Sequence, residues 1–223
     1  MTDDTKDRVL EAALAHVPFD GWSDRTLRAA AAEAGAEPGL VRALFPRGGV
    51  DLALAYHARG DDRMIARLGE MDLSALRFRD RIAAAVRARL EVADQELVRR
   101  GTTLFSLPMH SADGVRAIWG TADRIWTALG DSSQDLNWYT KRATLSAVYA
   151  STVLYWLGDT SPDHQATWEF LDRRLDNVMQ VEKLKATMRE NPLGKAVMAG
   201  SGKVFSTLRA PKLPDNLPGR LPR

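Results

Sequence analysis

Residues 130–170 read GDSSQDLNWYTKRATLSAVYASTVLYWLGDTSPDHQATWEF, the stretch with the strongest helix and turn signals of the chain. It predicts two helices folded back on each other across the four-residue joint GDTS. Ser132 and Ser133 are candidate caps of the first helix because short polar side chains accept hydrogen bonds from free backbone N–H groups. Ser161 followed by Pro162 predicts the start of the second helix, since proline at the first helical position lacks an N–H that would be unpaired anyway.

The chain between these two start signals carries no charge from residue 143 to residue 157. Such a run is too short to cross a bilayer, which takes roughly twenty apolar residues, so it predicts a buried helix. Nine of the sixteen aromatic residues of the chain lie between Trp119 and Phe170. This concentration is typical either of an ordinary core, the more frequent case, or of a cavity for a large apolar ligand.

The cavity interpretation makes a specific prediction. Helices at 115–129, 136–157 and 162–188 would enclose a slot for an isoprenoid or acyl chain, because aromatic and small uncharged residues fall on facing stripes. The candidate lining residues are Trp119, Trp126, Val148, Tyr149 and Thr152.

The segment directly before the uncharged run combines large aromatic residues with cations. Burying both kinds together is costly unless the cations find partners, and Trp and Tyr favour places where one end is apolar and the other wet. One interpretation is a solvated helix start with the rings folded inward; the other is an exposed patch that binds another protein. The candidate patch residues are Asp135, Asn137, Trp138, Tyr139, Lys141 and Arg142.

Two runs in this region, GDSSQDLNWYTKRA and SPDHQATWEFLDRRLDNV, resemble the ubiquinone-biosynthesis accessory family that is ninth in the coenzyme Q gene series. The resemblance covers most of the chain and is weakest at the N-terminus. It implies a TetR-like fold that binds lipid instead of DNA, with an isoprenoid quinone precursor or a phospholipid as ligand. It also implies a non-catalytic role beside a di-iron demethoxyubiquinone hydroxylase, for which the candidate patch would be the docking site.

The remaining sequence predicts an all-α protein, since helical spacing recurs and no strand-like alternation appears. The stretch from Pro18 to Gly21 should break the first helix, and Gly101 should end a long core helix, leaving a short apolar segment before Pro108. Two short helices joined by a turn at Gly35 follow the helix-turn-helix pattern. The expected helices lie at 7–17, 24–35, 37–45, 50–70, 78–101, 115–129, 136–157 and 162–188.

These elements predict a TetR-like helical bundle in three parts. The expected parts are a helix-turn-helix-like module at 1–49, a helical lipid-binding and dimerisation body at 50–190, and a basic amphipathic helix with a Pro-rich tail at 191–223. The last two body helices should pair two copies into a homodimer, as TetR-type folds usually do.

The helix-turn-helix module is expected to bind no nucleic acid. Residues 1–60 contain seven basic and nine acidic residues, and the candidate reading helix EPGLVRALF offers Arg42 and little else. A negatively charged module repels the phosphate backbone. A TetR-type repressor with an apolar effector pocket remains the alternative function.

The last segment differs in character, because six basic residues and one acid follow Glu190 while the rest of the chain is net negative. Glycines in 191–210 lower its helix propensity, so this basic amphipathic stretch would fold best on a surface. It predicts either docking to an anionic membrane or docking to the protein itself. The candidate membrane-binding residues are Leu193, Lys195, Val197, Lys203, Val204, Phe205, Leu208 and Arg209.

The composition limits the chemistry and the compartment. The chain has no cysteine, and its start, MTDDT, has no secretory or transit character. We therefore expect a cytoplasmic protein peripherally associated with the inner membrane. The four histidines are far apart and form no metal-binding motif. We expect no metal, no cofactor and no catalytic activity; an unrecognised enzyme is the least favoured class.

Overall fold

The computed structural model describes residues 2–133 and 135–190, and within these ranges the chain is helical without strands. This confirms the all-α prediction. The α-helices are α1 (Thr2–Asp20), α2 (Asp24–Glu33), α3 (Pro38–Leu44), α4 (Gly49–Glu70), α5 (Phe78–Glu91), α6 (Gln95–Phe105), α7 (Ser111–Ala128), α8 (Leu136–Gly158) and α9 (Gln165–Glu190), and a 3-10 turn, η1 (Pro162–His164), precedes α9.

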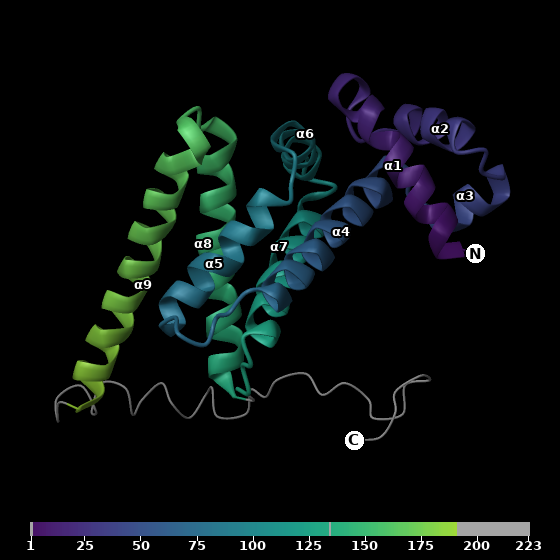
Figure 1. Cartoon of the computed structure of the whole chain (residues 1–223). Coiled ribbons are helices and arrows are strands. Elements are labelled where there is room, and N and C mark those ends of the chain that lie inside the picture. Colours follow the sequence, from purple (N-terminus) through teal and green to yellow (C-terminus); the bar gives the residue numbers. More distant parts are fainter. Residues whose placement is uncertain (1, 134, 191–223) are drawn as a thin grey trace.

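The helices form a small N-terminal module and a larger body that share one long helix. Figure 1 shows α1, α2 and α3 at one end and the pair of α8 and α9 at the opposite edge, with α4 running from the module into the body. Leu52 and Ala53 near the start of α4 are buried in the module's core, whereas Met64 and Leu68 near its end are buried in the body's core. The long α4 therefore fixes the module against the body.

The helix-turn-helix elements follow their sequence signals closely. The Ser23 hydroxyl accepts a hydrogen bond from the backbone N–H of Thr26 at 3.2 Å and caps α2, as predicted. Gly35 has φ +60°, the left-handed conformation expected where this helix stops. The predicted break at 18–21 is confirmed at its last residue, because α1 continues through Pro18 to Asp20 and Gly21, at φ +65°, ends it. A proline in the last turn costs only one backbone hydrogen bond.

The expected core helix at 78–101 is two helices. α5 ends at Glu91, and Asp94 caps α6 by accepting from the backbone N–H of Leu97 at 3.0 Å. Gly101 lies inside α6, and the segment before Pro108 continues the same helix. The apolar spacing continues across the break, so periodicity alone does not reveal it.

The predicted start of α8 is wrong in its cap, whereas the predicted start of the last helix is largely confirmed. Asp135, not Ser132 or Ser133, caps α8, and its carboxylate accepts from the backbone N–H of Asn137 at 2.9 Å. The expected helix at 162–188 begins at Pro162 with Ser161 before it, as predicted, and the Ser161 hydroxyl accepts from the backbone N–H of Ala166 at 3.0 Å; its first turn is the 3-10 turn η1, after which α9 starts. The side chain of Asp159 caps α9 by accepting from the backbone N–H of Thr167 at 2.9 Å.

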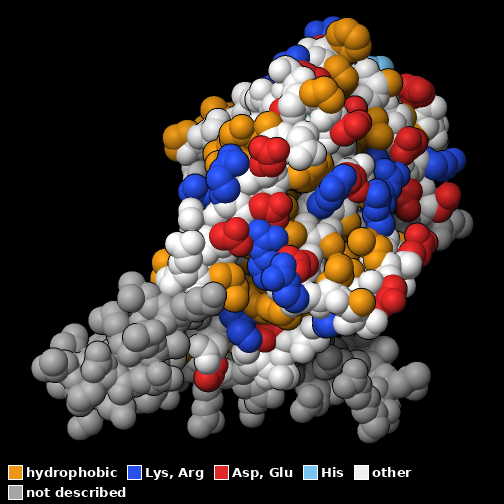
Figure 2. Space-filling model, turned by 60° about the vertical axis from the view of Figure 1, so that its left-hand side comes forward, with side chains coloured by type: hydrophobic (Ala, Val, Ile, Leu, Met, Phe, Trp, Pro, Cys, Tyr) orange, Lys and Arg blue, Asp and Glu red, His pale blue; other side chains and the backbone are white. Residues whose placement is uncertain are grey.

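Ion pairs on the surface link the outer helices. Figure 2 shows Lys and Arg side chains interspersed with Asp and Glu around hydrophobic side chains on one face. Arg79 on α5 contacts Asp172 at 2.8 Å and Asp176 at 3.1 Å on α9. The Arg87 guanidinium lies 4.8 Å from the centroid of the Trp168 ring. These contacts orient α9 along α5, although exposed ion pairs contribute at most about 1 kcal/mol each.

A buried ion pair ties the centre of the body together. Nε of Arg89 on α5 donates to Oδ1 of Asp61 on α4 at 2.6 Å, and the two side chains are 3% and 5% exposed. The hydroxyl of Thr121 on α7 donates to the same carboxylate at 3.0 Å. A Cβ at Gly60 would lie 2.7 Å from the Arg89 guanidinium, so glycine at this position makes room for the pair. Three helices are thus joined at one carboxylate.

Replacing Asp61 should destabilise the protein far more than replacing its neighbour. Asp61→Ala leaves the buried Arg89 guanidinium unpaired, and we expect the free energy of unfolding to fall by about 3–5 kcal/mol. Asp62→Ala is the matched control, because Asp62 forms an exposed pair with Arg124 and should change that energy by no more than about 0.5–1 kcal/mol. Urea unfolding followed by circular dichroism measures both. Equal losses for the two variants would contradict the central role of the Asp61–Arg89 pair.

Candidate functional site

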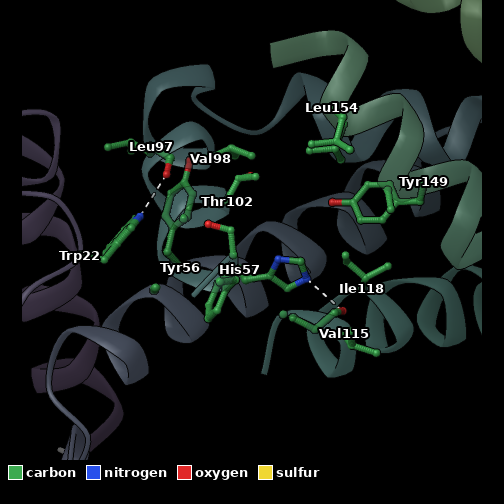
Figure 3. A pocket seen from close by; sticks show the side chains of 18 of the residues that line it. Trp22, Tyr56, His57, Leu97, Val98, Thr102, Val115, Ile118, Tyr149 and Leu154 are labelled. Carbon is green, nitrogen blue, oxygen red and sulfur yellow. Dashed lines mark hydrogen bonds between the residues drawn. The ribbon is translucent and has the colours of Figure 1, made fainter. Parts of the chain in front are cut away.

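A cavity of about 330 Å³ lies where the N-terminal module meets the body. Its walls come from α4, α5, α6, α7 and α8 and from Trp22 in the turn between α1 and α2 (Figure 3). Most of the lining side chains are apolar or aromatic, which is the usual composition of a site for an apolar ligand. The aliphatic lining residues include Leu97, Val98, Val115, Ile118, Val153 and Leu154.

Close helix packing shapes one wall of the cavity. A Cβ at Gly114 on α7 would lie 2.8 Å from Cβ of Phe105 on α6, so glycine permits this approach. Nε1 of Trp22 donates to the backbone carbonyl of Leu97 at 3.0 Å. The Trp22 ring also contacts the Tyr56 ring, with 5.2 Å between the centroids. These contacts hold two aromatic rings along the wall.

The inner end of the cavity is polar and is built on the buried ion pair. Nε2 of His57 lies 2.8 Å from the Thr121 hydroxyl and 3.1 Å from the carbonyl of Ala117. The Arg89 guanidinium donates to the carbonyl of His57 at 3.1 Å and to the carboxylate of Asp61. His57, Arg89 and Asp61 therefore hold one another in fixed positions.

These contacts define the protonation of His57. The carbonyl of Ala117 can only accept, so we assign the ring proton to Nε2. Burial lowers the pKa of His57, although the Asp61 carboxylate opposes this shift, and the ring is neutral at pH 7. Nδ1 then carries a lone pair and accepts hydrogen bonds. Burial also raises the pKa of the Tyr149 hydroxyl, which stays protonated.

The mouth of the cavity is apolar and open to solvent. Val115 on α7 is 67% exposed and Leu154 on α8 is 62% exposed, and both line the cavity. The hydroxyls of Ser106 and Ser111, which also line it, each donate to a nearby backbone carbonyl, at 2.8 and 3.0 Å. The cavity thus has a polar inner end and an apolar outer end.

Of the five predicted lining residues, Tyr149 lines this cavity. Val148 and Thr152 are buried elsewhere in the body, and Trp119 and Trp126 lie toward the other end of α7. The expected slot among the last three body helices also differs from this cavity, because none of the lining residues belongs to α9. The role of these five residues in lipid binding stays a prediction.

Sequence reasoning missed the residues of the inner end. Tyr56 and Arg89 lie in helices whose apolar spacing indicates only a core, and Trp22 lies in the short turn between α1 and α2. A signal was present: His57 and Asp61 stand four residues apart, so they share one face of α4, and both are polar on a helix whose other inward residues are apolar. The partner from α5 could be identified only once the helices were packed.

The predicted docking patch is organised by a second carboxylate, Asp131. Nζ of Lys141 donates to Oδ1 of Asp131 at 2.7 Å, and the Arg142 guanidinium donates to its Oδ2 at 3.0 Å. Burial raises the pKa of Asp131, but hydrogen bonds from Lys141, Ser133 and Arg142 outweigh burial and hold this pKa well below its usual range. Arg142 also pairs with Asp123, so each cation of the patch finds a counter-charge within the protein.

Aromatic rings pack on these cations. The Arg142 guanidinium lies 4.0 Å from the centroid of the Trp138 ring, which packs against Trp119 and against Tyr139 at centroid distances of 6.0 and 4.8 Å. Trp138 and Tyr139 are half-buried, while Asp135 and Asn137 are exposed. The expectation that Arg142 faces outward is wrong, because the guanidinium finds its counter-charges and a ring inside the fold.

The patch and the cavity lie at opposite ends of α8. Trp138 precedes Leu154 by sixteen residues on this helix, which corresponds to about 24 Å along the axis. The patch was expected to lie beside the mouth of the lipid site, but it does not lie beside the mouth of this cavity. A partner bound at the patch would contact the mouth only if it extended along α8.

Several other predictions concern metals, membranes and the tail. The described part of the chain contains no group of three or more His, Cys, Asp or Glu side chains that could hold a metal ion. None of the described helices has the length and hydropathy needed to cross a membrane. The candidate membrane-binding residues of 191–210 and the 191–223 segment lie outside the described residues.

Solved structures provide the first comparison. The TetR transcriptional regulator from Nitrosomonas europaea superimposes with a TM-score of 0.60 at 20% identity, over 77% of this chain and 95% of the regulator. At this identity the similarity concerns the fold. It confirms the predicted TetR-like architecture.

Comparisons of sequence identify relatives of this chain. The COQ9 family model matches residues 111–182. The ubiquinone biosynthesis protein COQ9 of Drosophila melanogaster is 31% identical over 82% of this chain and 57% of its own length, and the human protein is 28% identical over 86% and 63%. COQ9-B of Xenopus laevis is 30% identical over 86% of this chain and 68% of its own length. The chain thus spans about three fifths of the length of the fly and human proteins. The names of the fly, human and frog proteins all include the word mitochondrial. From the matched 111–182 region, the coverage of the frog relative and the TetR-like fold together, we conclude that this chain belongs to the COQ9 family.

Proposed function

We propose that this protein is a non-catalytic accessory protein of ubiquinone biosynthesis that binds an isoprenoid quinone precursor or a phospholipid. The observation that carries the proposal is the apolar, open-mouthed cavity among α4 to α8 in a member of a family whose relatives are named ubiquinone biosynthesis proteins. A cavity of about 330 Å³ is at the small end of ligand sites, so a long chain would extend through the mouth.

The proposed partner is a di-iron demethoxyubiquinone hydroxylase that docks at the start of α8. Trp138 and Tyr139 are the proposed contacts, since half-buried aromatic residues often dominate binding at protein interfaces. Asp135 and Asn137 would form the polar rim. Lys141 and Arg142 would act indirectly, because they position Trp138 through Asp131 and through ring contacts.

Two further associations belong to the proposal. The protein would form a homodimer through α8 and α9, which expose Tyr155, Met179 and Val181; a monomeric mass by light scattering would contradict this. Residues 191–210 would bind an anionic membrane surface, and this part of the proposal rests on their sequence alone.

The alternative function, transcriptional repression, is disfavoured by the start of α3. The Glu37 carboxylate accepts hydrogen bonds from the backbone N–H groups of Gly39 and Leu40 at 2.8 and 2.7 Å. These bonds lower the pKa of Glu37, so a negative charge occupies the N-terminus of the helix that would read DNA. That charge would repel phosphate. Salt-sensitive binding of a duplex at physiological ionic strength would contradict this inference.

Filling the cavity should remove bound lipid. Ala150 lines the cavity, so Ala150→Trp places an indole in it, at a cost in stability of about 1–3 kcal/mol. Ala147→Trp is the matched control, because Ala147 is exposed on the same helix and does not line the cavity. Solvent extraction of the purified proteins, followed by mass spectrometry, should find isoprenoid quinones or phospholipids with the wild type and with Ala147→Trp but not with Ala150→Trp. Equal lipid in all three would place the binding site elsewhere.

Truncating the aromatic residues of the patch should weaken hydroxylase binding. We expect Trp138→Ala and Tyr139→Ala each to cost about 2 kcal/mol, which is roughly thirtyfold in affinity, without loss of bound lipid. Phe19→Ala is the control, because Phe19 is an 85% exposed aromatic residue on α1. The measurement is a pull-down with the hydroxylase together with the amount of demethoxyubiquinone in cells. Normal hydroxylase binding by both patch variants would show that the docking site lies elsewhere. Unfolding of Trp138→Ala would show that Trp138 is a structural residue.

Deleting 191–210 should abolish co-sedimentation with anionic liposomes, because basic residues near such a surface contribute on the order of 1 kcal/mol each. The thermal midpoint of the protein should change little if this segment acts as a membrane anchor. Co-sedimentation equal to that of the full chain would refute the anchor.

A further inference from the structure

The inner end of the cavity offers a hydrogen-bond acceptor that has no partner in the described part of the protein. The proton on Nε2 of His57 is engaged by the Ala117 carbonyl and the Thr121 oxygen. Among the described residues, no hydrogen bond reaches Nδ1 of the same ring. The His57 side chain is 21% exposed although its surroundings are buried, because it faces the cavity.

Neighbouring groups prevent the proton of the His57 ring from moving from Nε2 to Nδ1. Moving the proton to Nδ1 would place the lone pair of Nε2 against the lone pairs of the Ala117 carbonyl. The Thr121 hydroxyl cannot relieve this, since its hydrogen is donated to the Asp61 carboxylate at 3.0 Å. Protonating both nitrogens is opposed by burial and by Arg89. The cavity therefore presents a fixed acceptor at its inner end.

The surroundings of this acceptor suit a flat ring. Figure 3 shows the Tyr149 hydroxyl pointing into the cavity from the side opposite Tyr56, with the His57 ring between the two tyrosines. Aromatic rings pack favourably on other aromatic rings, and Tyr56 and Trp22 line the same region. The lining toward the mouth is aliphatic, with Val115 and Leu154 exposed at the rim.

From this polarity we propose that the cavity binds its ligand ring-first, as a prenylated phenol or hydroquinone whose hydroxyl donates to Nδ1 of His57 and whose tail leaves past Val115 and Leu154. This inference deepens the proposed lipid-binding function and rests on it. A quinone has only acceptor oxygens, which would leave Nδ1 without a donor. A hydroxyl of the reduced form satisfies this acceptor, whereas the Tyr149 hydroxyl can donate to an oxygen of either form.

The pose has a consequence for transfer. With the ring at the closed inner end, the reactive part of the ligand is shielded from solvent while it is bound. Since the docking patch lies about 24 Å from the mouth along α8, the ring must leave the cavity before a partner can modify it. Binding and delivery are then separate steps.

Two ligands that differ only in the donor test the proposal. We would titrate the full-length protein with 2-geranylphenol and with its methyl ether by isothermal titration calorimetry. The phenol should bind about tenfold more tightly, because the ether cannot satisfy the buried acceptor. Lengthening the tail to a farnesyl group should not weaken binding, since the tail points out of the mouth. A farnesyl compound that fails to bind would overturn the ring-first pose.

A direct readout comes from the histidine itself. In ¹⁵N-histidine-labelled protein, the phenol should shift the Nδ1 resonance of His57, while the ether should leave it unchanged. His57→Phe should bind both ligands with equal affinity, and His16→Phe, a substitution on α1 outside the cavity lining, should keep the tenfold difference. If His57→Phe does not fold, the wild-type protein still tests the pose, because an Nδ1 resonance of His57 that the phenol does not shift would contradict it.

The outcomes separate the two proposals. Equal affinity for the phenol and the ether, lost in both cases in Ala150→Trp, would overturn the ring-first pose while supporting lipid binding in the cavity. No binding of either ligand, together with no lipid in the purified protein, would overturn both.

Discussion

The fold depends on one buried charge pair, Arg89 with Asp61, because it joins α4, α5 and α7 at the centre of the body. Removing two charges from water is costly, and such a pair often contributes little net stability compared with apolar residues of similar size. Its value lies in position: the Asp61 carboxylate fixes Thr121, Thr121 fixes the His57 ring, and the guanidinium holds the His57 carbonyl. A core of leucines would pack the helices but would not place a hydrogen-bond acceptor.

A second buried carboxylate, Asp131, positions side chains in the same way at the far end of the body. Asp131 collects Lys141 and Arg142, and the Trp138 ring lies over the guanidinium. This arrangement connects the end of α7 to the start of α8 and sets how Trp138 and Tyr139 meet the surface. The two ends of α8 are thus organised by different carboxylates, one serving the cavity and one serving the patch. The cavity and the proposed docking patch are thus positioned by separate sets of contacts.

Local signals predicted most of the fold because they depend on neighbours in the chain. Ser23 capping α2 and the left-handed glycine at position 35 follow from short-range hydrogen bonding and backbone sterics. The errors are of one kind. The break between α5 and α6, the cap at Asp135 and the 3-10 turn before α9 were missed where several capping residues competed or where apolar spacing ran through a break. At the break between α5 and α6 a tertiary contact favours the observed boundary, because the Tyr56 hydroxyl accepts from the backbone N–H of Asp94 at 3.0 Å.

The sequence by itself determined the all-helical class, the helix-turn-helix pattern and the resemblance to a family, since all three are carried by spacing and short motifs along the chain. It also pointed to Tyr149 and to the start of α8. Only the tertiary structure decided which residues face the cavity and which cations face inward. Arg89 and His57 are thirty-two residues apart, and Arg142 meets Asp123 and Asp131 only when α7 and α8 pack. A buried charge must be paired wherever the fold brings a partner, and that partner cannot be deduced from spacing along the chain.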